Sequence, residues 1–457
     1  MEHHDATQVF ADFAVGLDYR DLPDEVVARA KQLLLDTVGV IVAASSQAPE
    51  HRAIVDLVIE EGGKEESSII AYGNRVPCYM AAFANGAMAH CLDYDDNAFN
   101  AVHVGTAVVP ATLASAERAG KVSGKELLCA IVVGSELQCR LALSVLAGTN
   151  RACLQKWFLT PLFGVLSAAA TSGKILGLGR DQLANALGIA CNQAAGIKEM
   201  GVGGTLRAFY AAFPGKAGML SSLLAARGVT TSENSLEGTA GLMAGYFNGQ
   251  YDRELLTGKL GAEFKCLGIG FKPWPACGST HVFVESALHL TEQHDIAAED
   301  VEAVKVYTSA YINWKLCQPL EMRRRPPHSI AAKYSIPFTV ATAIAKRAVN
   351  VGSFTPEALS DARVLAVAEK VVPEVHSDAG RVEIKLRNGK TYSNKVEYSL
   401  GSAGKPLSSE HIESKFRDCL AYSIKPLRPG AADKVTGLVR NLEDVDDAAE
   451  IVRWLVP

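Results

Sequence analysis

Several signatures of well-known enzyme classes are missing from this chain of 457 residues. No Gly-x-Gly-x-x-Gly follows a predicted strand and no Walker loop occurs, so nucleotide binding has no support. The chain also has no Gly-x-Ser-x-Gly elbow and no His-Glu-x-x-His motif. Its ten cysteines are scattered without a Cys-x-x-Cys pair, which argues against zinc ribbons and thioredoxin-like redox sites.

The chain likewise lacks a large charge excess and long apolar runs. Its formal net charge is -5, so we expect neither nucleic acid nor a membrane surface as a partner. Apolar runs such as Leu127–Gly134 are too short to span a bilayer. The polar start, Met1-Glu-His-His-Asp, does not resemble a signal peptide. Together with cysteines placed in apolar helical patterns, this predicts a cytoplasmic protein.

Most of the first half of the chain has a helical pattern. From Ala81 to about Gly228 alanine is dense and β-branched alternation is rare. Ser123-Gly-Lys-Glu126 is a capping box that marks a helix start. Small residues on either side of residues 90–103 indicate closely packed core helices. This part is therefore predicted to be an all-helical bundle and not a doubly wound sheet.

The pattern changes near Phe264. Val301–Thr308 alternates apolar and polar residues, as do residues 381–387 and 391–398, which are joined by the hairpin signal Asn388-Gly389. Helices are expected between these strands, at 331–349 and 361–371, and again from Ser408.

The sequence thus predicts a mainly α protein with a large all-helical domain and a smaller α+β domain. The helical domain covers residues 1–264, with 404–457 returning to it, and the α+β domain covers 265–403. A ligand site between the two domains is the natural hypothesis.

The stretch His90–His103 concentrates two imidazoles and three carboxylates, Asp93, Asp95 and Asp96, between apolar helices. An acid/base cluster on a buried scaffold is what proton transfer requires. Two alternatives remain open at this point. The aspartates could be turn formers or N-caps of the next helix, or they could ligate a metal through hard oxygens. No glycine stands where an EF-hand loop needs one, so no metal is expected.

A second candidate segment runs from Phe271 to His281. Lys272 lies among prolines and aromatic residues, and loss of solvent there would lower the pKa of its ammonium toward use as a base or carboxylate anchor. His281 is expected to begin a helix whose backbone donors could help to bind an anion. The alternative is a Pro-rich domain crossover with Lys272 in water.

These segments together resemble the MmgE/PrpD family, which includes 2-methylcitrate dehydratases, cis-aconitate decarboxylases and iminodisuccinate epimerases. The matching motifs are Asn85-Gly-x-x-x-His90-x-x-Asp93-x-Asp-Asp96, His103, Ala225-Arg-Gly228, Leu236-Glu-Gly238, Lys272-Pro-Trp-Pro-x-Cys277-x-x-x-His281, Ala332-Lys-Tyr-Ser-Ile-Pro337 and Lys415-Phe-Arg-Asp-Cys419. The resemblance implies a helical domain with an α+β lid, a homodimer, and a junction site for small carboxylates. It also implies that no metal or organic cofactor is needed.

By the same resemblance, the family's site positions fall on the following residues: Asp93, Asn97, His103, Lys272, and Cys277 or His281. Three positions depart from the family pattern. Phe158 stands where dehydratases and decarboxylases carry the His of Gly-Trp-His-Pro. The Lys of Gly-Thr-x-x-Lys is missing, with Arg207 nearest, and Phe338 replaces a Tyr. Arg binds carboxylates but stays protonated, and Phe carries no proton, so the pocket should be more apolar there.

The resulting hypothesis is an enzyme that moves a proton next to a carboxylate, a lyase (dehydratase or decarboxylase) or, second, an isomerase or epimerase. His103 would be the general acid/base, oriented by Asp93. Lys272 and Arg207 would hold the substrate carboxylate. Polar substrate contacts are expected from Asn97, Tyr210, Cys277 and His281. A carboxylate-binding family member without catalysis is the rival reading.

Overall fold

The computed structural model describes residues 4–201, 205–206 and 209–457. The chain divides into two compact units. Unit 1 comprises the chain up to Cys91, Asp95–Gly270 and Ser408–Pro457, and unit 2 comprises Leu92–Tyr94 and Phe271–Leu407. Three residues in the middle of the acidic stretch thus belong to unit 2, although both of their flanks belong to unit 1.

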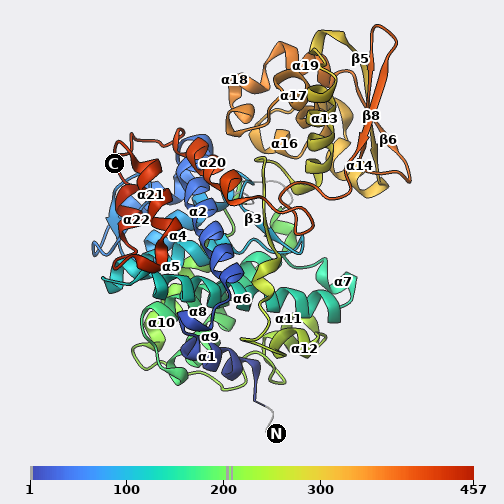
Figure 1. Cartoon of the computed structure of the whole chain (residues 1–457). Helices are drawn as coiled ribbons and strands as arrows, with labels where there is room; N and C mark the ends of the chain where they lie inside the picture. The colour runs from blue at the N-terminus through green and yellow to red at the C-terminus, as the bar shows by residue number, and fades with distance from the viewer. Residues whose placement is uncertain (1–3, 202–204, 207–208) are drawn as a thin grey trace. The chain divides into compact units, whose positions relative to one another are not determined.

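Unit 1 is built mainly from helices (Figure 1). In chain order these are α1 (Ala6–Gly16), α2 (Asp24–Gln47), α3 (Arg52–Glu61), α4 (Cys78–Cys91), α5 (Gly105–Ala119), α6 (Gly124–Gly148), α7 (Arg151–Leu154), α8 (Leu159–Ile175), α9 (Arg180–Gln193), α10 (Ala212–Ala225), α11 (Leu242–Phe247), α12 (Arg253–Thr257), α20 (Ser409–Leu420), α21 (Ala431–Arg440) and α22 (Glu450–Trp454). The short strands β1 (Ser67–Ser68) and β2 (Arg75–Val76) pair with each other, as do β3 (Asp96–Ala98) and β4 (Ile269–Phe271).

Close approach between helix backbones explains the small residues in the core of unit 1. A Cβ added at Gly218 on α10 would lie 2.4 Å from the Val165 carbonyl oxygen on α8. At Gly86 on α4 it would lie 3.2 Å from the Cα of Ala212. Larger side chains would force these helices apart, so the predicted close packing of core helices is confirmed.

Helix α6 is the longest of the core helices described. The capping box predicted at its start is present, because Ser123 accepts from the Glu126 backbone N–H and Glu126 accepts in return from that of Ser123. By length and composition alone α6 would suffice to cross a membrane, but 94% of its most apolar window is buried inside the protein. Here α6 serves as a core helix.

The C-terminal helix α20 packs against α2, near the start of the chain (Figure 1). Asp36 on α2 and Lys415 on α20 form an ion pair of 2.6 Å between side chains that are 0% and 3% exposed. The predicted return of the tail to the helical part of the protein thus includes a buried charged contact.

Unit 2 combines a four-stranded sheet with helices. Its strands are β5 (Val301–Thr308), β6 (Val371–Val375), β7 (Arg381–Leu386) and β8 (Thr391–Lys395), in the order β6-β5-β7-β8. Its helices are α13 (His281–Gln293), α14 (Ala310–Cys317), α15 (Leu320–Arg324), α16 (Ser329–Lys333), α17 (Ile336–Lys346), α18 (Pro356–Leu359) and α19 (Ala362–Ala368). Inward residues of β5 and β7 form an apolar core with α13 and α17.

The predicted hairpin is present, since β7 and β8 are antiparallel and Gly389 in their turn has a φ of 82°. The mainly α fold with a smaller α+β part is confirmed. The helix predicted over 361–371 is wrong at its end, because the chain leaves α19 at Ala368 and forms β6, parallel to β5.

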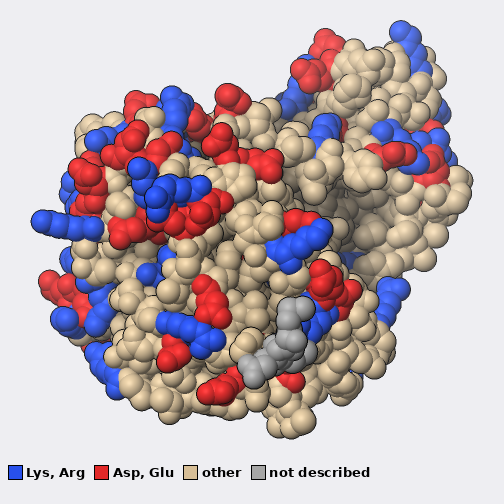
Figure 2. Space-filling model, turned by 60° about the horizontal axis from the view of Figure 1, so that its bottom comes forward, with Lys and Arg blue, Asp and Glu red and all other residues tan. Residues whose placement is uncertain are grey.

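Charged side chains of both signs are interspersed on the face drawn in Figure 2. Many exposed charges of the described residues are paired, for example Arg180 with Asp12 and Lys259 with Glu263. Among the described residues seen from this side, no wide area carries one sign of charge.

Candidate active site

The predicted site residues divide between the two units. His103, Asn97 and Tyr210 belong to unit 1, whereas Asp93 and Lys272 belong to unit 2. Cys277 and His281 are also in unit 2. Arg207 lies outside the described residues.

The backbone around His103 is fixed by neighbouring core helices. It follows β3 and immediately precedes α5, and its N–H donates to the Thr160 hydroxyl on α8 at 3.0 Å. Its carbonyl accepts from the Gln138 amide on α6 at 3.3 Å. The side chain keeps 16% exposure. An imidazole that is anchored in this way but reachable by solvent is suited to exchange protons with a bound molecule.

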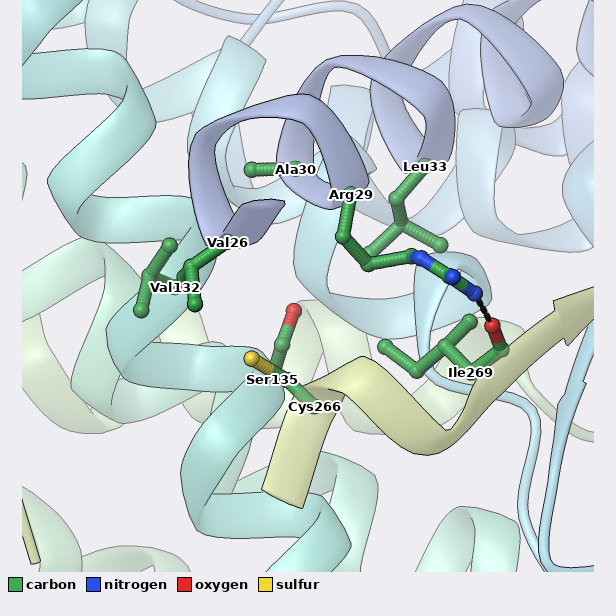
Figure 3. A pocket seen from close by; sticks show the side chains of 8 residues that line it. All are labelled: Val26, Arg29, Ala30, Leu33, Val132, Ser135, Cys266 and Ile269. Carbon is green, nitrogen blue, oxygen red and sulfur yellow. Dashed lines mark hydrogen bonds between the residues drawn. The ribbon is translucent and has the colours of Figure 1, made fainter. Parts of the chain in front are cut away.

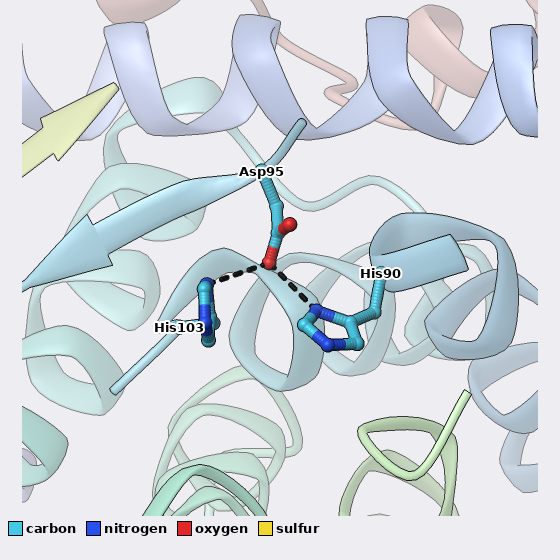
Figure 4. A group of neighbouring side chains, drawn as sticks. All are labelled: His90, Asp95 and His103. Atoms are coloured by element: carbon cyan, nitrogen blue, oxygen red, sulfur yellow. Dashed lines mark hydrogen bonds and ion pairs between the residues drawn. The ribbon is translucent and has the colours of Figure 1, made fainter. Parts of the chain in front are cut away.

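Two oxygens lie at the Nδ1 of His103. The Asp96 carbonyl is 2.6 Å away and Oδ2 of Asp95 is 2.9 Å away (Figure 4). A carbonyl oxygen can only accept, so Nδ1 carries the hydrogen. In the neutral ring Nε2 then holds the lone pair, which makes it the basic nitrogen.

The carboxylate described beside His103 is that of Asp95, and orientation of this ring by Asp93 stays a prediction. Asp93 has a φ of 53° in the turn after α4, and its side chain instead contacts Lys272 within unit 2. The left-handed backbone at Asp93 directs successive side chains to different partners, which a linear reading of the three aspartates cannot reveal.

Asp95 serves two imidazoles at once. Its Oδ2 also lies 2.9 Å from Nδ1 of His90, near the end of α4 (Figure 4). Asp95 is fully buried, and the His90 side chain is 8% exposed. The His90 and His103 rings meet edge to face, with centroids 4.9 Å apart. No separate role was predicted for His90 or Asp95, and the five-residue spacing between them is the signal in the sequence that could have indicated their contact.

Asp96 accepts from backbone donors at the start of α5, although the N-cap residue of that helix is Val104. Its carboxylate accepts from the backbone N–H groups of Val104 and Gly105, at 2.7 and 2.8 Å, where α5 begins. Burial, followed by the charge of Asp95, raises the pKa of Asp96 to about 7. Two adjacent buried carboxyl groups therefore differ in role, one accepting from backbone donors of a helix and one holding imidazoles.

Asn97 uses its side chain in a turn. Its Oδ1 accepts from the Asn100 backbone N–H at 3.0 Å, which is an Asx-type contact. The amide nitrogen is the group through which Asn97 would contact a substrate. Such a contact stays a prediction.

Lys272 lies in the predicted loop but is not a solvated lysine. It is 6% exposed, and its Nζ pairs with Oδ1 of Asp93 at 2.5 Å and donates to the Asp93 carbonyl at 3.1 Å. Next to it, the Tyr94 hydroxyl donates to the Pro273 carbonyl at 3.3 Å. The alternative, a crossover loop with Lys272 in water, is wrong because Lys272 is buried and its ammonium pairs with Asp93 within unit 2.

Cys277 and His281 are held near each other by backbone contacts of unit 2. The Cys277 N–H donates to the Lys333 carbonyl at 3.0 Å. His281 begins α13 as predicted, is 3% exposed, and its Nε2 lies 3.1 Å from the Ala276 carbonyl. Its ring also meets Trp274 edge to face. These contacts give both residues structural partners, and their proposed contacts with substrate stay predictions.

The His90, Asp95 and His103 side chains are also a set that could hold a divalent cation, since one ligand atom from each lies within 4.8 Å of the others. Both 2.9 Å separations, however, join a ring nitrogen to a carboxylate oxygen, which is ordinary hydrogen-bond length. We therefore interpret the set as a hydrogen bond from His90 to Asp95 and a charged contact between His103 and Asp95.

A small pocket elsewhere in unit 1 offers less chemistry (Figure 3). It is lined mainly by apolar side chains of α2, α6, β4 and the segment just before β4, namely Val26, Arg29, Ala30, Leu33, Val132, Ser135, Cys266 and Ile269. The Arg29 guanidinium donates to the Ile269 carbonyl, and burial raises the pKa of the Cys266 thiol well above its usual value. A pocket with a bonded cation and a protonated thiol has no general base to offer.

Sequence comparison gives this arrangement a family context. The MmgE/PrpD N-terminal domain matches residues 8–254, and the MmgE/PrpD C-terminal domain matches residues 274–435. This chain belongs to the MmgE/PrpD family. Both segments that carry the predicted site residues thus lie in, or directly before, a region shared with the family.

Similar proteins include three cis-aconitate decarboxylases that match along nearly their whole length. That of Aspergillus terreus (strain NIH 2624 / FGSC A1156) is 27% identical, over 97% of this chain and 94% of its own. The Homo sapiens protein is 28% identical over 98% and 94%, and the Mus musculus protein 27% over 98% and 93%.

Phe158, at the position where the MmgE/PrpD resemblance predicts a His, packs beside the imidazole pair. Its ring stacks on Tyr210 with centroids 5.1 Å apart and an interplanar angle of 17°. Tyr210 in turn meets the His90 ring edge to face at 4.8 Å. The three rings of Phe158, Tyr210 and His90 form a continuous aromatic wall that ends at His103. The position where a polar group is predicted to be lost therefore lies in unit 1, next to the Tyr210 ring that contacts His90.

Proposed function

We propose that this chain is an enzyme that moves a proton at a carbon next to the carboxylate of a small substrate, as a lyase that expels water or carbon dioxide. The observation that carries the proposal is the His103 ring, whose Nδ1 faces two oxygens so that Nε2 is the basic nitrogen. The full-length likeness to cis-aconitate decarboxylases supports the lyase class.

The chemistry of either lyase reaction fits one imidazole. In a dehydration, Nε2 removes the proton next to the carboxylate, the C–H electron pair forms the new double bond, and the hydroxyl group takes a proton back from the imidazolium and leaves as water. In a decarboxylation, the C–C electron pair stays on the carbon as carbon dioxide departs, and the imidazolium then gives its proton to that carbon. Asp95 stabilises the imidazolium in both cases.

A cation must balance the substrate carboxylate and the enolate-like charge that develops next to it. We propose Lys272 for this task, with Asp93 holding its ammonium in place, and Arg207 as a second carboxylate ligand. Asn97, Tyr210, Cys277 and His281 remain our candidates for the remaining substrate contacts. His103 and Lys272 belong to different units, so their action on one substrate stays a prediction.

The aromatic wall bears on the choice of substrate. Phe158 and Tyr210 offer ring faces and edges where a His would offer a proton and a hydrogen bond. We therefore propose a mono- or dicarboxylate with an apolar substituent over a tricarboxylate such as cis-aconitate, because the rings of Phe158 and Tyr210 suit an apolar group better than a carboxylate.

A panel of mono-, di- and tricarboxylates, cis-aconitate included, tests the proposal in deuterated water. Proton NMR should show deuterium entering next to the carboxylate of at least one compound, together with a new product. His103→Ala should lower turnover at least about a hundredfold. His289→Ala, at an exposed position of α13, is the matched control and should leave turnover unchanged. Normal turnover in His103→Ala would refute the role of this ring.

Two other functions are distinguished by the same experiment. Deuterium exchange with inversion and no elimination would identify an epimerase. Binding without exchange would identify a carboxylate-binding protein that has lost catalysis, a reading favoured by Phe158 at the family's His position. Chiral separation of the recovered compound decides between exchange with and without inversion.

We further propose a homodimer as the working form. Helix α10 carries exposed apolar side chains at Phe213, Leu220 and Leu224, which are 36–48% exposed and lie on one stripe. The same stripe on a second copy could cover it about a twofold axis. Leu220→Glu should give a monomer in light scattering, and Leu57→Glu, at an exposed position of α3, should not. A monomeric wild type would contradict this proposal.

A further inference from the structure

His90 is a buried titratable residue that the mechanism above does not use. It projects from α4, and its Nδ1 lies 2.9 Å from the same Asp95 oxygen that lies 2.9 Å from Nδ1 of His103 (Figure 4). A single carboxylate oxygen therefore serves two ring nitrogens that come from different elements of unit 1.

Sharing one oxygen fixes both rings. A carbonyl and an ionised carboxylate only accept, so Nδ1 of His90 donates to Asp95 and Nδ1 of His103 donates to the Asp96 carbonyl, with the Asp95 oxygen 2.9 Å away as a charged contact. In each neutral ring the lone pair is then on Nε2. Each ring receives only part of the stabilisation that Asp95 would give to a lone imidazolium. In addition, two imidazolium ions with centroids 4.9 Å apart would repel each other. A positive charge on one ring therefore disfavours a positive charge on the other.

We propose that His90 is a positioning residue for His103, which shares the Asp95 oxygen so that His103 keeps its Nε2 lone pair while the two rings carry at most one extra proton between them. The catalytic part of this claim rests on the proposed function, whereas the effect on His103 is a property of the free protein. His90 itself need not touch the substrate.

Other groups also face His103. Asp96 presents its carbonyl to Nδ1 and its carboxylate to α5, and Tyr210 faces the His90 ring. The neighbours from α8 and α6, Thr160 and Gln138, are neutral and contact the backbone of His103. The carboxyl groups of Asp95 and Asp96 both act electrostatically on His103. Replacing His90 leaves both carboxyl groups in place, so the effect of the His90 ring can be tested separately.

Replacing His90 predicts a shift of defined sign. In His90→Leu the whole charge of Asp95 acts on His103 and the ring-to-ring repulsion disappears, so the pKa of His103 should rise by about one unit. In His90→Gln the side-chain amide can still donate to Asp95 while the repulsion is lost, so the rise should be smaller. His289→Leu, far along the chain and exposed, is the control for replacing a histidine.

The experiment is an NMR titration of the full chain labelled with carbon-13 at histidine Cε1. The His103 signal is assigned as the one missing in His103→Asn, and circular dichroism checks that each variant is folded. The same variants are assayed for the pH dependence of kcat/KM on the active compound of the panel. This readout separates positioning from a loss of stability, which would lower activity at every pH.

A rise of about one unit in His90→Leu, a smaller rise in His90→Gln and a matching shift of the acidic limb of kcat/KM would support the proposal. A rise in the NMR titration in a protein that turns over no carboxylate would support the positioning role and overturn the proposed function. A His103 pKa that stays within 0.2 units of wild type, about the error of such a titration, in a folded His90→Leu would overturn the positioning role.

Discussion

Replacement of Lys415 by methionine should destabilise unit 1 by several kcal/mol, because it removes one partner of a buried ion pair. The Asp36 and Lys415 side chains are 0% and 3% exposed, and their charged atoms are 2.6 Å apart. Methionine keeps much of the volume of lysine but leaves the Asp36 carboxylate buried without its ammonium. Breaking such a pair typically costs about 3–5 kcal/mol.

The size of the effect can be followed by urea unfolding with circular dichroism. With a slope of about 3 kcal/mol per M, a loss of about 4 kcal/mol lowers the midpoint by about 1.3 M. The double variant Asp36→Leu/Lys415→Met removes both charges and should lie near the wild type, since replacing a buried pair by apolar groups is often neutral. The two single changes should therefore be strongly non-additive.

An exposed ion pair on neighbouring helices provides the control. Arg417 on α20 and Asp433 on α21 are 2.6 Å apart but 44% and 79% exposed. Arg417→Met should cost less than about 1 kcal/mol. The reasoning is refuted if Lys415→Met shifts the midpoint no more than Arg417→Met does, or if the double variant is as unstable as the sum of the singles.

Three further predictions concern packing, pH and the aromatic wall. Gly218→Ala should cost about 1–3 kcal/mol in urea unfolding because its Cβ would lie 2.4 Å from the Val165 oxygen, whereas Gly437→Ala, with nothing within 4 Å, should stabilise by about 0.5–1 kcal/mol. Burial lowers the pKa of His51 to about 4, so the unfolded chain binds a proton below pH 6.5 that the folded protein does not. Stability should fall by about 2 kcal/mol between pH 6.5 and 5 at this site, and His51→Gln should remove that part of the slope. Phe158→His should raise carbon dioxide release from cis-aconitate at least about tenfold if the missing imidazole limits that reaction; an unchanged rate would show that it does not.

Much of the fold follows from local sequence patterns. The capping box at Ser123, the hairpin turn at Asn388-Gly389 and the helical periodicity of the first half of the chain all have short-range causes. Strand β6 was missed because its partner β5 lies more than sixty residues earlier and pairs with it in parallel. Pro373 within β6 also argues against a strand, although it fits the edge position that β6 occupies in the sheet.

The candidate site could be predicted only in part, for a similar reason. The residue types and the segments could be found by their unusual composition and by family resemblance. Which carboxylate serves which partner depends on the backbone of the turn, and the positive φ of Asp93 leaves no mark on residue type, since Asp tolerates both conformations. His90 was overlooked because the sequence does not show that one oxygen of Asp95 contacts both His90 and His103.

The division of labour among the three aspartates gives a last prediction. Asp93 pairs with Lys272, Asp95 bridges two imidazoles, and Asp96 accepts from backbone donors of α5. In Asp95→Asn the amide oxygen can still take the place of Oδ2, but the negative charge that stabilises the imidazolium of His103 is lost. We expect kcat on the active carboxylate to fall at least about a hundredfold and the pKa of His103, followed by NMR, to fall as well.

Asp93→Asn is the matched control for that variant, because it changes the same carboxylate two residues earlier. It should weaken carboxylate binding through Lys272 and raise KM, while the His103 titration stays where it is in the wild type. If Asp93→Asn moved the His103 titration and Asp95→Asn did not, Asp93 and not Asp95 would orient the His103 ring, as the sequence alone predicts. The hydrogen bonds at Asp95 would then be structural, and the proton carrier would have to be sought elsewhere in the chain.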